Sequence, residues 1–308
     1  MKKILVLMST YNGTDYVVEQ LESIRLQKKV IVNILIRDDG SKDETLDVLK
    51  EYQTRNPALI LEIIAGKNLG STSSFSELVK YAYVKYSSIF DYYSLADQDD
   101  FWLEKKLTKA SMELDKLDNS LANTYCSDTK VVDSNLNSLD GIRPRKVQMT
   151  KGRALVRNIA TGCTMVFNKR ALELYATKSP EFIKIHDHAL FLICSFMGNV
   201  VYDPNSYILY RQHGNNQIGG SDSVSNRFKD RLKHKGDLKK HYIENVAKSF
   251  LVAFHDDLSD EDKVLIRKVS DYRKSLLNRV RLLFSRGIAK EEFEDNMFFK
   301  IKVLLGGI

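Results

Sequence analysis

The chain has 308 residues, of which 43% are hydrophobic and 28% are charged, a composition typical of a soluble globular protein. With only 4 prolines and 15 glycines the sequence excludes long low-complexity linkers, and it contains no run of about 18 apolar residues that would predict a membrane-spanning helix. The net charge of +7 is concentrated beyond residue 226, where 19 Lys and Arg residues stand against 13 Asp and Glu.

The three cysteines, Cys126, Cys163 and Cys194, lie far apart and form no Cys-x-x-Cys pair. Such a sparse, odd-numbered set is typical of a reducing compartment, where each is expected to be a small buried apolar residue. The basic start and the short apolar run after it lead into polar residues without a small-residue cleavage site, which does not fit a signal peptide. We therefore expect a cytoplasmic protein.

In the N-terminal part of the chain, apolar runs typical of buried strands alternate with amphipathic stretches typical of helices. The expected strands cover residues 3–8, 30–36, 59–64 and 91–95, and the expected helices cover residues 17–24, 43–52 and 74–86. This alternation predicts an α/β fold with a mostly parallel, Rossmann-like sheet that is flanked by helices on both faces.

A polar segment follows each of the expected strands. These segments are residues 10–12, 37–41, 67–68 and 97–100. Ligands of parallel sheets bind in the crevice at the carboxyl ends of the strands. We therefore expect the four segments to line one binding site.

The segment Asp97-Gln98-Asp99-Asp100 places three carboxylates at the mouth of a buried strand. Like charges in such a position are unfavourable unless a cation offsets them. Carboxylates on a turn suit Mg²⁺ or Mn²⁺, which also bind the oxygens of a diphosphate and stabilise the charge on a leaving group. The alternative is that Asp99 or Asp100 merely caps a helix that starts near Phe101.

A second acidic segment, Asp38-Asp39-Gly40-Ser41, is typical of a turn when it is taken alone. Its position beside the other strand ends favours a different interpretation. We expect an acid here to hydrogen-bond the base or the ribose of a nucleotide.

Together, these segments resemble the successive motifs of family 2 glycosyltransferases with a GT-A fold. The matching motifs are Ser9-Thr10-Tyr11-Asn12-Gly13, Arg37-Asp38-Asp39-Gly40-Ser41-Lys42-Asp43, Asn68-Leu69-Gly70 and Asp97-Gln98-Asp99-Asp100. Their order and spacing agree with the family, and the resemblance extends over roughly residues 1–215.

The resemblance implies an inverting enzyme that uses a nucleotide-sugar donor. It implies that Asp39 binds the nucleotide base, and that Asp97 and Asp99 are the Asp-x-Asp pair that handles the metal ion and the diphosphate. The other expected nucleotide and donor contacts from these motifs are Thr10, Tyr11, Asn12 and Asn68.

Two later segments resemble the parts of the family that bind the sugar and the acceptor. In residues 161–167, Gly162 would let the backbone approach the donor sugar, and a plain buried strand with a bend is the alternative. Asp187 stands where the family has its general base, and a helix N-cap is the alternative. His186 and His188 flank this acid, but alternating positions at a helix start share no face, which argues against a metal site. His188 also replaces an aromatic residue that is common in relatives.

A polar, glycine-bearing segment at residues 210–220 follows an expected strand at residues 207–210. It resembles the Arg-x-His-Gly-Asn-Asn loop of bacterial rhamnosyltransferases of surface-polysaccharide synthesis. Arg211 is expected to bind the diphosphate and His213 the metal ion or a phosphate once the loop closes, and a surface loop without a role is the alternative. With the Asp-Gln-Asp-Asp segment, this loop favours rhamnose, carried by thymidine diphosphate (dTDP), as the donor sugar.

We expect residues 1–220 to form the glycosyltransferase domain and residues 221–308 to form a basic, helical C-terminal region. Apolar residues of this region recur at helical spacing, with basic residues opposite. They are Leu265, Val269, Tyr272, Leu276, Val280 and Leu283. The region is expected to pack on the catalytic domain or on a sister subunit of a homo-oligomer, or to dock peripherally on an anionic membrane surface. Nucleic-acid binding is not expected, because no recognised module accompanies the basic residues.

The leading hypothesis is therefore a metal-dependent, inverting transfer of L-rhamnose from dTDP-rhamnose to a hydroxyl of a glycolipid or a growing cell-surface polysaccharide. A UDP-hexose donor in the same fold is the first alternative. A nucleotidyltransferase fits less well, because residues 9–13 lack the Gly-rich, basic phosphate loop of those enzymes. An inactive binding module also fits less well, because the set of Asp39, Asp97, Asp99 and Asp187 is complete.

Overall fold

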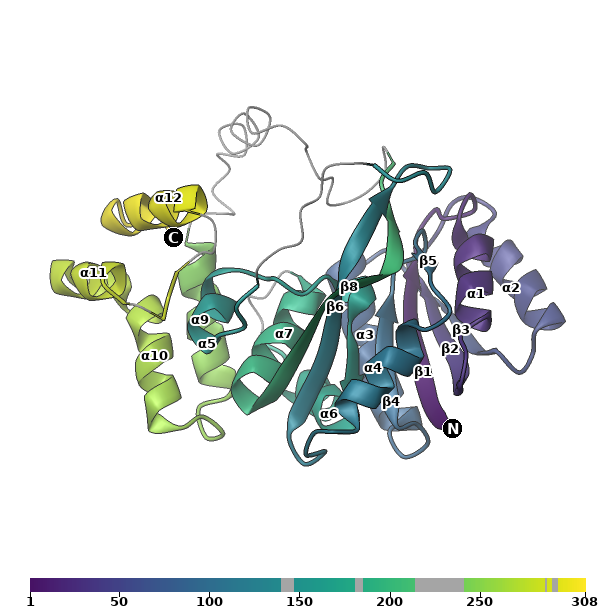
Figure 1. Cartoon of the computed structure of the whole chain (residues 1–308), viewed down its shortest axis with the longest axis horizontal. Helices are drawn as coiled ribbons and strands as arrows, with labels where there is room; N and C mark the ends of the chain where they lie inside the picture. Colours follow the sequence, from purple (N-terminus) through teal and green to yellow (C-terminus); the bar gives the residue numbers. More distant parts are fainter. Residues whose placement is uncertain (140–146, 181–184, 214–240, 286, 290–292) are drawn as a thin grey trace. The chain divides into compact units, whose positions relative to one another are not determined.

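The computed structural model describes residues 1–139, 147–180, 185–213, 241–285, 287–289 and 293–308 (Figure 1). The chain divides into two compact units. The first consists of Met1–Arg145, Ala160–Ser179 and Lys184–Arg211, and the second consists of Lys146–Ile159, Pro180–Ile183 and Gln212–Ile308.

The first unit is built on an eight-stranded sheet with the strand order β3-β2-β1-β4-β7-β6-β8-β5. The strands are β1 (Lys2–Thr10), β2 (Val30–Asp38), β3 (Ile60–Ala65), β4 (Tyr92–Ala96), β5 (Phe101–Trp102), β6 (Ala122–Val132), β7 (Val166–Asn168) and β8 (Gly198–Arg211). The first four strands pair in parallel, as predicted. Strand β7 runs antiparallel to both of its neighbours and β5 runs antiparallel to β8, so the complete sheet is mixed.

Helices cover both faces of this sheet (Figure 1). They are α1 (Val17–Arg25), α2 (Thr45–Arg55), α3 (Ser71–Tyr86), α4 (Lys106–Leu114), the short η1 (Gly162–Thr164), α6 (Lys169–Lys178) and α7 (His186–Met197). Side chains of α1, α2 and α4 share one hydrophobic cluster with one face of β1. Helices α3, α6 and α7 contact one another and form a separate layer. The two layers bury the continuous apolar run of β1 on both faces, as the sequence predicted.

The second unit consists of helices in its described part. They are α5 (Lys151–Val156), α9 (Tyr242–Ala253), α10 (Asp260–Ser270), η3 (Tyr272–Lys274), α11 (Leu276–Leu283) and α12 (Phe293–Leu304). Ser259 caps α10 by accepting a hydrogen bond from the backbone of Asp262. Among the described helices of both units, none combines the length and the apolar character that a membrane span requires.

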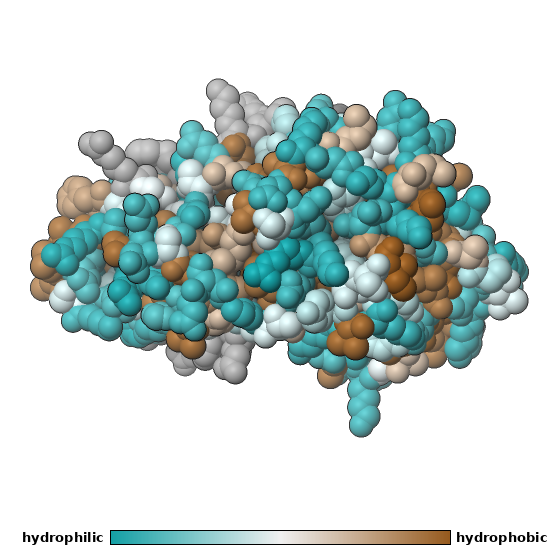
Figure 2. All heavy atoms as spheres, turned by 90° about the horizontal axis from the view of Figure 1, so that it is seen from below, coloured by the Kyte–Doolittle hydropathy of each residue, from teal (hydrophilic) through white to brown (hydrophobic). Residues whose placement is uncertain are grey.

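The apolar face predicted for residues 265–283 is not continuous. The chain leaves the helix after Ser270 and starts α11 at a new cap, Ser275, whose side chain accepts a hydrogen bond from the backbone of Asn278. The break changes the direction in which the apolar residues before and after it point. Val269 and Tyr272 are buried, whereas Leu276 is 76% exposed. Figure 2 shows apolar residues beside hydrophilic ones at the left end of the view, where Figure 1 labels α11.

Candidate active site

The carboxyl ends of the parallel strands lie side by side, as predicted. Thr10 at the end of β1 is in register with Asp38 at the end of β2, and Asp38 is in register with Ala65 of β3. On the other side of β1, Met8 pairs with Ala96 at the end of β4. The polar segments after these strands therefore start from one edge of the sheet, which is where ligands of such sheets bind.

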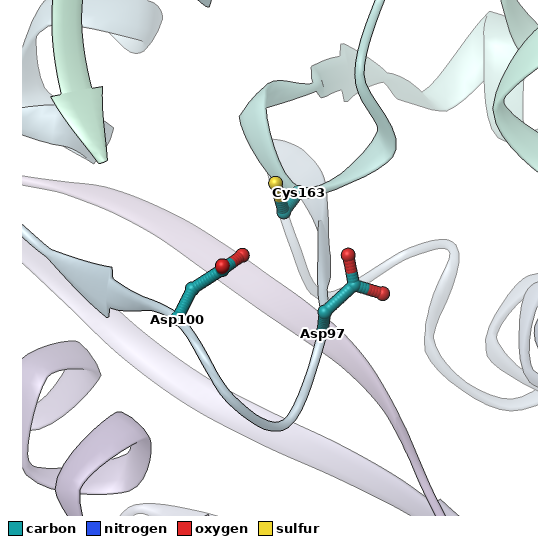
Figure 3. A group of neighbouring side chains, drawn as sticks. All are labelled: Asp97, Asp100 and Cys163. Atoms are coloured by element: carbon teal, nitrogen blue, oxygen red, sulfur yellow. The ribbon is translucent and has the colours of Figure 1, made fainter. Parts of the chain in front are cut away.

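The turn after β4 brings two of its three acids together (Figure 3). The side chains of Asp97 and Asp100 rise from the two arms of the turn toward the segment that carries Cys163. Potential ligand atoms of these three residues all lie within 4.8 Å of one another. Among the residues that the structure describes, this is the group of acidic, histidine or cysteine side chains close enough to share a metal ion. We call Asp97, Asp100 and Cys163 the acidic cluster.

The electrostatics of the acidic cluster are unfavourable without a cation. Burial raises the pKa of Asp97 well above its ordinary value, and the charges of Asp100, Asp99 and Asp187 raise it further. Burial and the charge of Asp99 raise the pKa of Asp100 to about 7, and one oxygen of this carboxylate is buried without a hydrogen-bond partner among the described residues. Such a group carries a free-energy cost unless a proton or a cation neutralises it.

The predicted metal pair was Asp97 and Asp99, whereas the structure groups Asp97 with Asp100. Asp99 takes part through its backbone, since its carbonyl oxygen accepts a hydrogen bond of 2.9 Å from Nε of Arg211. The helix-cap alternative for this turn is wrong. Phe101 starts the short strand β5, which pairs with β8, and the next helix begins only at Lys106.

A buried lysine lies beneath the acidic cluster. Nζ of Lys106 donates a hydrogen bond of 3.1 Å to Ser94 and lies 3.4 Å from the ring centroid of Trp102. Burial lowers the pKa of Lys106 to about 7, although the nearby Cys163 and Asp100 act in the opposite direction. Sequence reasoning missed this residue, because a lysine at a helix start is usually solvated.

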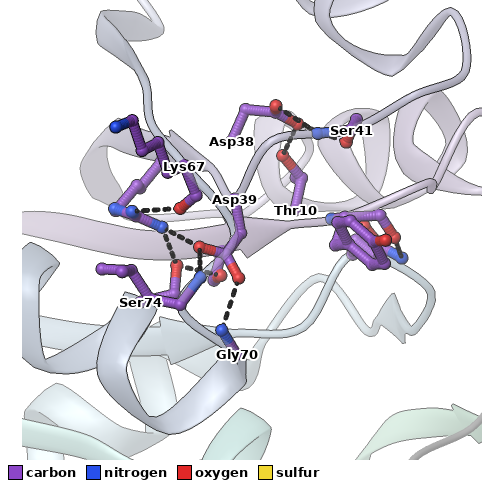
Figure 4. Close-up of polar contacts among 12 residues, drawn as sticks. Thr10, Asp38, Asp39, Ser41, Lys67, Gly70 and Ser74 are labelled. Atoms are coloured by element: carbon purple, nitrogen blue, oxygen red, sulfur yellow. Dashed lines mark hydrogen bonds and ion pairs between the residues drawn. The ribbon is translucent and has the colours of Figure 1, made fainter.

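At the ends of β1 and β2, the side chain of Asp38 links the two strands (Figure 4). Its carboxylate accepts a hydrogen bond of 3.0 Å from the hydroxyl of Thr10 and one of 2.9 Å from the backbone of Ser41. Thr10 and Asp38 are both almost completely buried. Thr10, expected to line the nucleotide pocket, therefore also fixes the turn after β2.

Asp39, the expected base-binding acid, is held from two directions (Figure 4). It forms a buried ion pair with Arg37, and its two oxygens accept hydrogen bonds of 2.9 Å from the backbone of Leu69 and of Gly70. Gly70 has a φ of +80°, a conformation that strongly favours glycine, and it precedes the first turn of α3. Asp39 thus orders the loop after β3, a role that its turn-like sequence did not reveal.

The remaining expected nucleotide contacts lie in the loops after β1 and β3. Tyr11 is 40% exposed, and its backbone exchanges two hydrogen bonds with the side chain of Gln98 at 2.8 and 3.0 Å. Asn12 adopts a positive φ of 48° and links the turn after β1 to Ser41 and Lys42. The exposed Asn68 lies in the loop that Asp39 orders. Tyr11 and Asn68 present accessible surface to a ligand.

Asp187, the expected general base, lies in the first turn of α7 and is 8% exposed. Its Oδ2 accepts a hydrogen bond of 3.0 Å from the backbone of Gly162. The N-cap of α7 is Ile185 and the cap position makes no side-chain hydrogen bond, so the alternative that Asp187 is an N-cap is wrong. Gly162 directly precedes Cys163, so this hydrogen bond places the predicted base next to the acidic cluster.

Gly162 permits this approach of α7. A Cβ atom at this position would lie 2.9 Å from Nε2 of His186 and 3.3 Å from Cβ of Asp187. Sequence reasoning attributed the glycine to the approach of a sugar, and the structure adds the approach of α7. His186 stacks on Phe75 with ring centroids 4.0 Å apart, and burial lowers its pKa to about 3, so the ring is neutral at physiological pH.

Arg211, at the end of β8, differs from the expected diphosphate contact. It is 2% exposed, pairs with Glu19 of α1, hydrogen-bonds the backbone of Ser134 and of Asp99, and lies 4.5 Å above the ring of Tyr16. The guanidinium therefore braces the acidic turn from within the fold.

His213, the expected third metal contact, belongs to the second unit. The rest of its loop, residues 214–220, lies outside the described residues. The metal role of His213 stays a prediction.

Comparison with known proteins agrees with this architecture. The model of the family described as glycosyl transferase family 2 matches residues 5–175. The dTDP-rhamnosyl transferase RfbG of Shigella flexneri is 30% identical over 259 residues, which cover 81% of this chain and 85% of that protein. The UDP-Glc:alpha-D-GlcNAc-diphosphoundecaprenol beta-1,3-glucosyltransferase WfgD of Escherichia coli is 24% identical over 245 residues, which cover 79% of this chain and 87% of that protein.

Two solved structures share the fold at low sequence identity. TarS of S. aureus (residues 1–349) in complex with UDP-GlcNAc superposes with a TM-score of 0.57 at 15% identity, over 98% of this chain and 81% of that one. The mannosyltransferase PcManGT from Pyrobaculum calidifontis in complex with GDP-Man and Mn²⁺ gives a TM-score of 0.53 at 15% identity, over 98% and 79% of the two chains. With the GT-A architecture and the family match over residues 5–175, the chain belongs to glycosyl transferase family 2.

Proposed function

We propose that this enzyme transfers a sugar from a nucleotide diphosphate to an acceptor hydroxyl, with inversion and with the help of a divalent cation. The observation that carries the proposal is the meeting of the acidic cluster and Asp187 at the carboxyl edge of the sheet, beside the ordered loops that follow β1, β2 and β3. A site of this kind holds a diphosphate next to a base, which is the arrangement that glycosyl transfer needs.

The residues of the acidic cluster fit a hard divalent cation. Two carboxylates face each other, and one oxygen of Asp100 is buried without a partner among the described groups. Burial raises the pKa of the Cys163 thiol well above its ordinary value, so the thiol stays protonated and is a poor ligand for a hard ion. Asp97 and Asp100 would therefore hold Mg²⁺ or Mn²⁺ through oxygen, the ligand that both ions prefer, and Asp99 is a further candidate. Bound there, the ion would neutralise charge on the diphosphate leaving group.

Asp187 is the proposed general base. Inverting transfer is one displacement, in which the acceptor oxygen bonds to the anomeric carbon of the donor while the bond from that carbon to the diphosphate breaks. The proton of the acceptor hydroxyl passes to the carboxylate of Asp187. The hydrogen bond from Gly162 fixes Oδ2, so this oxygen has a defined direction relative to the sheet edge.

The nucleotide is proposed to bind beside Thr10, Tyr11, Asn12, Asp39 and Asn68. Tyr11 offers an exposed ring against which a base can stack. Asp39 would act mainly by holding the loop of Leu69 and Gly70, since donors of the protein already occupy both of its oxygens.

We propose L-rhamnose from dTDP-rhamnose as the first donor to test and a UDP-hexose as the second. The dTDP-rhamnosyl transferase RfbG is similar over most of both chains, which supports the first choice. The glucosyltransferase WfgD, whose name states a UDP-glucose donor and a diphosphoundecaprenol-linked acceptor, supports the second. It also supports a lipid-linked or polysaccharide acceptor for this chain.

A thermal-shift panel tests the donor. We expect dTDP-rhamnose with Mn²⁺ to raise the melting temperature more than UDP-glucose, GDP-mannose or dTDP alone, because a ligand that binds the folded state stabilises it. A larger rise in melting temperature with UDP-glucose would indicate that the donor is a UDP-hexose. No shift with any nucleotide sugar, with or without Mn²⁺, would contradict the proposal.

The Asp187→Asn variant tests the base. We expect sugar transfer to fall by on the order of 10²-fold or more, while the thermal shift with donor and Mn²⁺ stays as in the unmodified protein. His188→Gln, one residue away on α7, is the matched control and should retain most of the activity. Normal transfer by Asp187→Asn would place the base elsewhere.

A further inference from the structure

The last two helices of the second unit expose large apolar side chains. Within its bounds, each of the other described helices exposes at most one such residue. On α11 and its C-cap the exposed residues are Leu276, Leu277, Val280 and Phe284, and on α12 and the residue after it they are Met297, Ile301, Leu304 and Leu305. Phe284 and Leu305 are the most prominent of those near the helix ends, at 81% and 78% exposure.

The exposed residues of α11 form one stripe. At about 100° per residue, the positions of Leu276, Leu277, Val280 and Phe284 fall within an arc of about 100°. The buried Leu282 lies nearly opposite the middle of this arc, so the stripe faces away from the packed side of the helix. The exposed Arg281 flanks the stripe on one side, and the partly buried Arg279 lies on the other.

Helix α12 repeats the same arrangement. Met297, Ile301, Leu304 and Leu305 fall within an arc of about 100°, and the backbone of Leu305 continues the helical hydrogen bonding to Ile301. The buried Phe299 and Val303 lie on the opposite side. Lys300 and Lys302 flank the stripe, one on each side, and both are exposed.

The two helices are held together. The guanidinium of Arg279 on α11 donates a hydrogen bond of 3.1 Å to the backbone carbonyl of Leu304 on α12. The segment after α12 returns to η3, where the hydroxyl of Tyr272 accepts a hydrogen bond of 2.9 Å from the backbone of Ile308. Both apolar stripes are therefore presented by one packed substructure.

We propose that α11 and α12 form a docking surface for an anionic lipid bilayer. An apolar stripe edged by Lys or Arg is the pattern with which a helix lies in a membrane interface, because the apolar side chains enter the acyl boundary while the cations meet anionic headgroups. A second copy of the chain is a poorer occupant. A symmetric contact would bring the flanking cations of one copy against the same cations of the other.

This inference rests on the proposed function, which supplies the reason for docking: a lipid-linked acceptor would be reached at a membrane surface. The docking itself involves no donor sugar, metal ion or acceptor. The two proposals can therefore fail separately.

The test is flotation of the full-length protein with vesicles of phosphatidylcholine, with and without phosphatidylglycerol. One double variant, Phe284→Ser with Leu305→Ser, shortens both stripes. A second, Lys300→Glu with Lys302→Glu, reverses the flanking charge on α12. The matched controls make the same changes at exposed positions of the first unit, Val84→Ser with Met112→Ser and Lys80→Glu with Lys116→Glu.

We expect the unmodified protein to float with vesicles that contain phosphatidylglycerol and to remain unbound with phosphatidylcholine alone. Each of the two double variants should bind at least about tenfold more weakly, because every interfacial cation or buried apolar side chain contributes severalfold to the affinity. Melting curves should show that all four variants are folded, and the controls should bind as the unmodified protein does.

Three results would overturn the docking surface. One is no flotation of the unmodified protein, and another is equal flotation of all variants. The third is a change from dimer to monomer in Phe284→Ser with Leu305→Ser at unchanged flotation, which would assign the stripes to a second copy. Flotation without any sugar transfer would contradict the proposed function and leave the docking surface intact.

Discussion

Two pairs of aspartates lie at the same edge of the sheet, yet they meet opposite conditions. After β2, Asp38 and Asp39 accept hydrogen bonds from two hydroxyls, an arginine and three backbone groups. After β4, Asp97 and Asp100 face each other, and one oxygen of Asp100 is buried without a partner among the described residues. Buried carboxylates with a full set of hydrogen-bond donors hold loops in place. Buried carboxylates that lack such a set are unfavourable as charged groups until a cation binds to them.

The largest expected effect in this comparison is on activity. Asp97→Asn removes a charge from the pair that lacks a full set of donors, and we expect Mn²⁺-dependent sugar transfer to fall by on the order of 10³-fold, because the leaving diphosphate loses its cation. The unfolding free energy of the metal-free variant should be equal to or greater than that of the unmodified protein, because a source of repulsion is gone. Transfer rates and urea unfolding measure the two quantities. If the metal-free Asp97→Asn variant is clearly less stable than the unmodified protein, the charge of Asp97 stabilises the fold and the two aspartate pairs do not differ in this respect.

The second effect is on the stability of the fold, and it concerns Asp38 and Asp39, the pair with a full set of hydrogen-bond donors. Asp39→Asn leaves the buried guanidinium of Arg37 without its counter-charge and weakens the hold on Gly70. We expect the unfolding free energy to fall by about 3 kcal/mol in urea denaturation, with or without Mn²⁺. Asp47→Asn, at an exposed position in α2, should change stability by less than about 0.5 kcal/mol and is the control. If Asp39→Asn leaves the unfolding free energy unchanged, the ion pair of Asp39 with Arg37 does not stabilise the loop.

The smallest effect is a pH dependence. In the unfolded chain an aspartate titrates near pH 4, whereas in the fold the pKa of Asp100 is raised to about 7. A raised pKa means that the folded state binds more protons, so this contribution to stability is complete below about pH 4 and is lost as the pH rises through 7. We expect the metal-free protein to lose this contribution between pH 4 and 7, and Mn²⁺ to restore it at neutral pH.

The measurement is thermal unfolding between pH 4 and 7 in chelator and in Mn²⁺. Lys106, with a pKa lowered to about 7, remains protonated in both the folded and the unfolded state over most of this range, so its own contribution appears mainly above it. Asp100→Asn should remove the difference between the two conditions. If the pH profile of stability is identical with and without Mn²⁺, the cation does not bind at the acidic cluster.

Much of the first unit could be predicted from the sequence, because its signals are local. The apolar runs of β1, β2 and β4 and the polar residues that end them place Thr10, Asp39 and Asp97 at one sheet edge without any knowledge of long-range contacts. Asp187 could be placed only through a family resemblance, since it reaches the site across α7 and Gly162.

What the sequence could not predict depends on side-chain direction and on distant partners. Spacing alone does not decide whether Asp99 or Asp100 turns toward Asp97. The pairing of Arg211 with Glu19 joins residues 192 positions apart, and no local pattern marks it. The break between α10 and α11 contains neither proline nor glycine, so the apolar periodicity seemed to continue through it.

The contact between Lys106 and Trp102 has a practical consequence. Trp102 is the single tryptophan of the chain, it lies two positions after Asp100, and its ring is in cation–π contact with Lys106. The emission of an indole shifts with the electric field across its ring, so intrinsic fluorescence reports on this one place in the molecule. Occupancy of the crevice can thus be followed optically, in unlabelled protein and without a coupled assay.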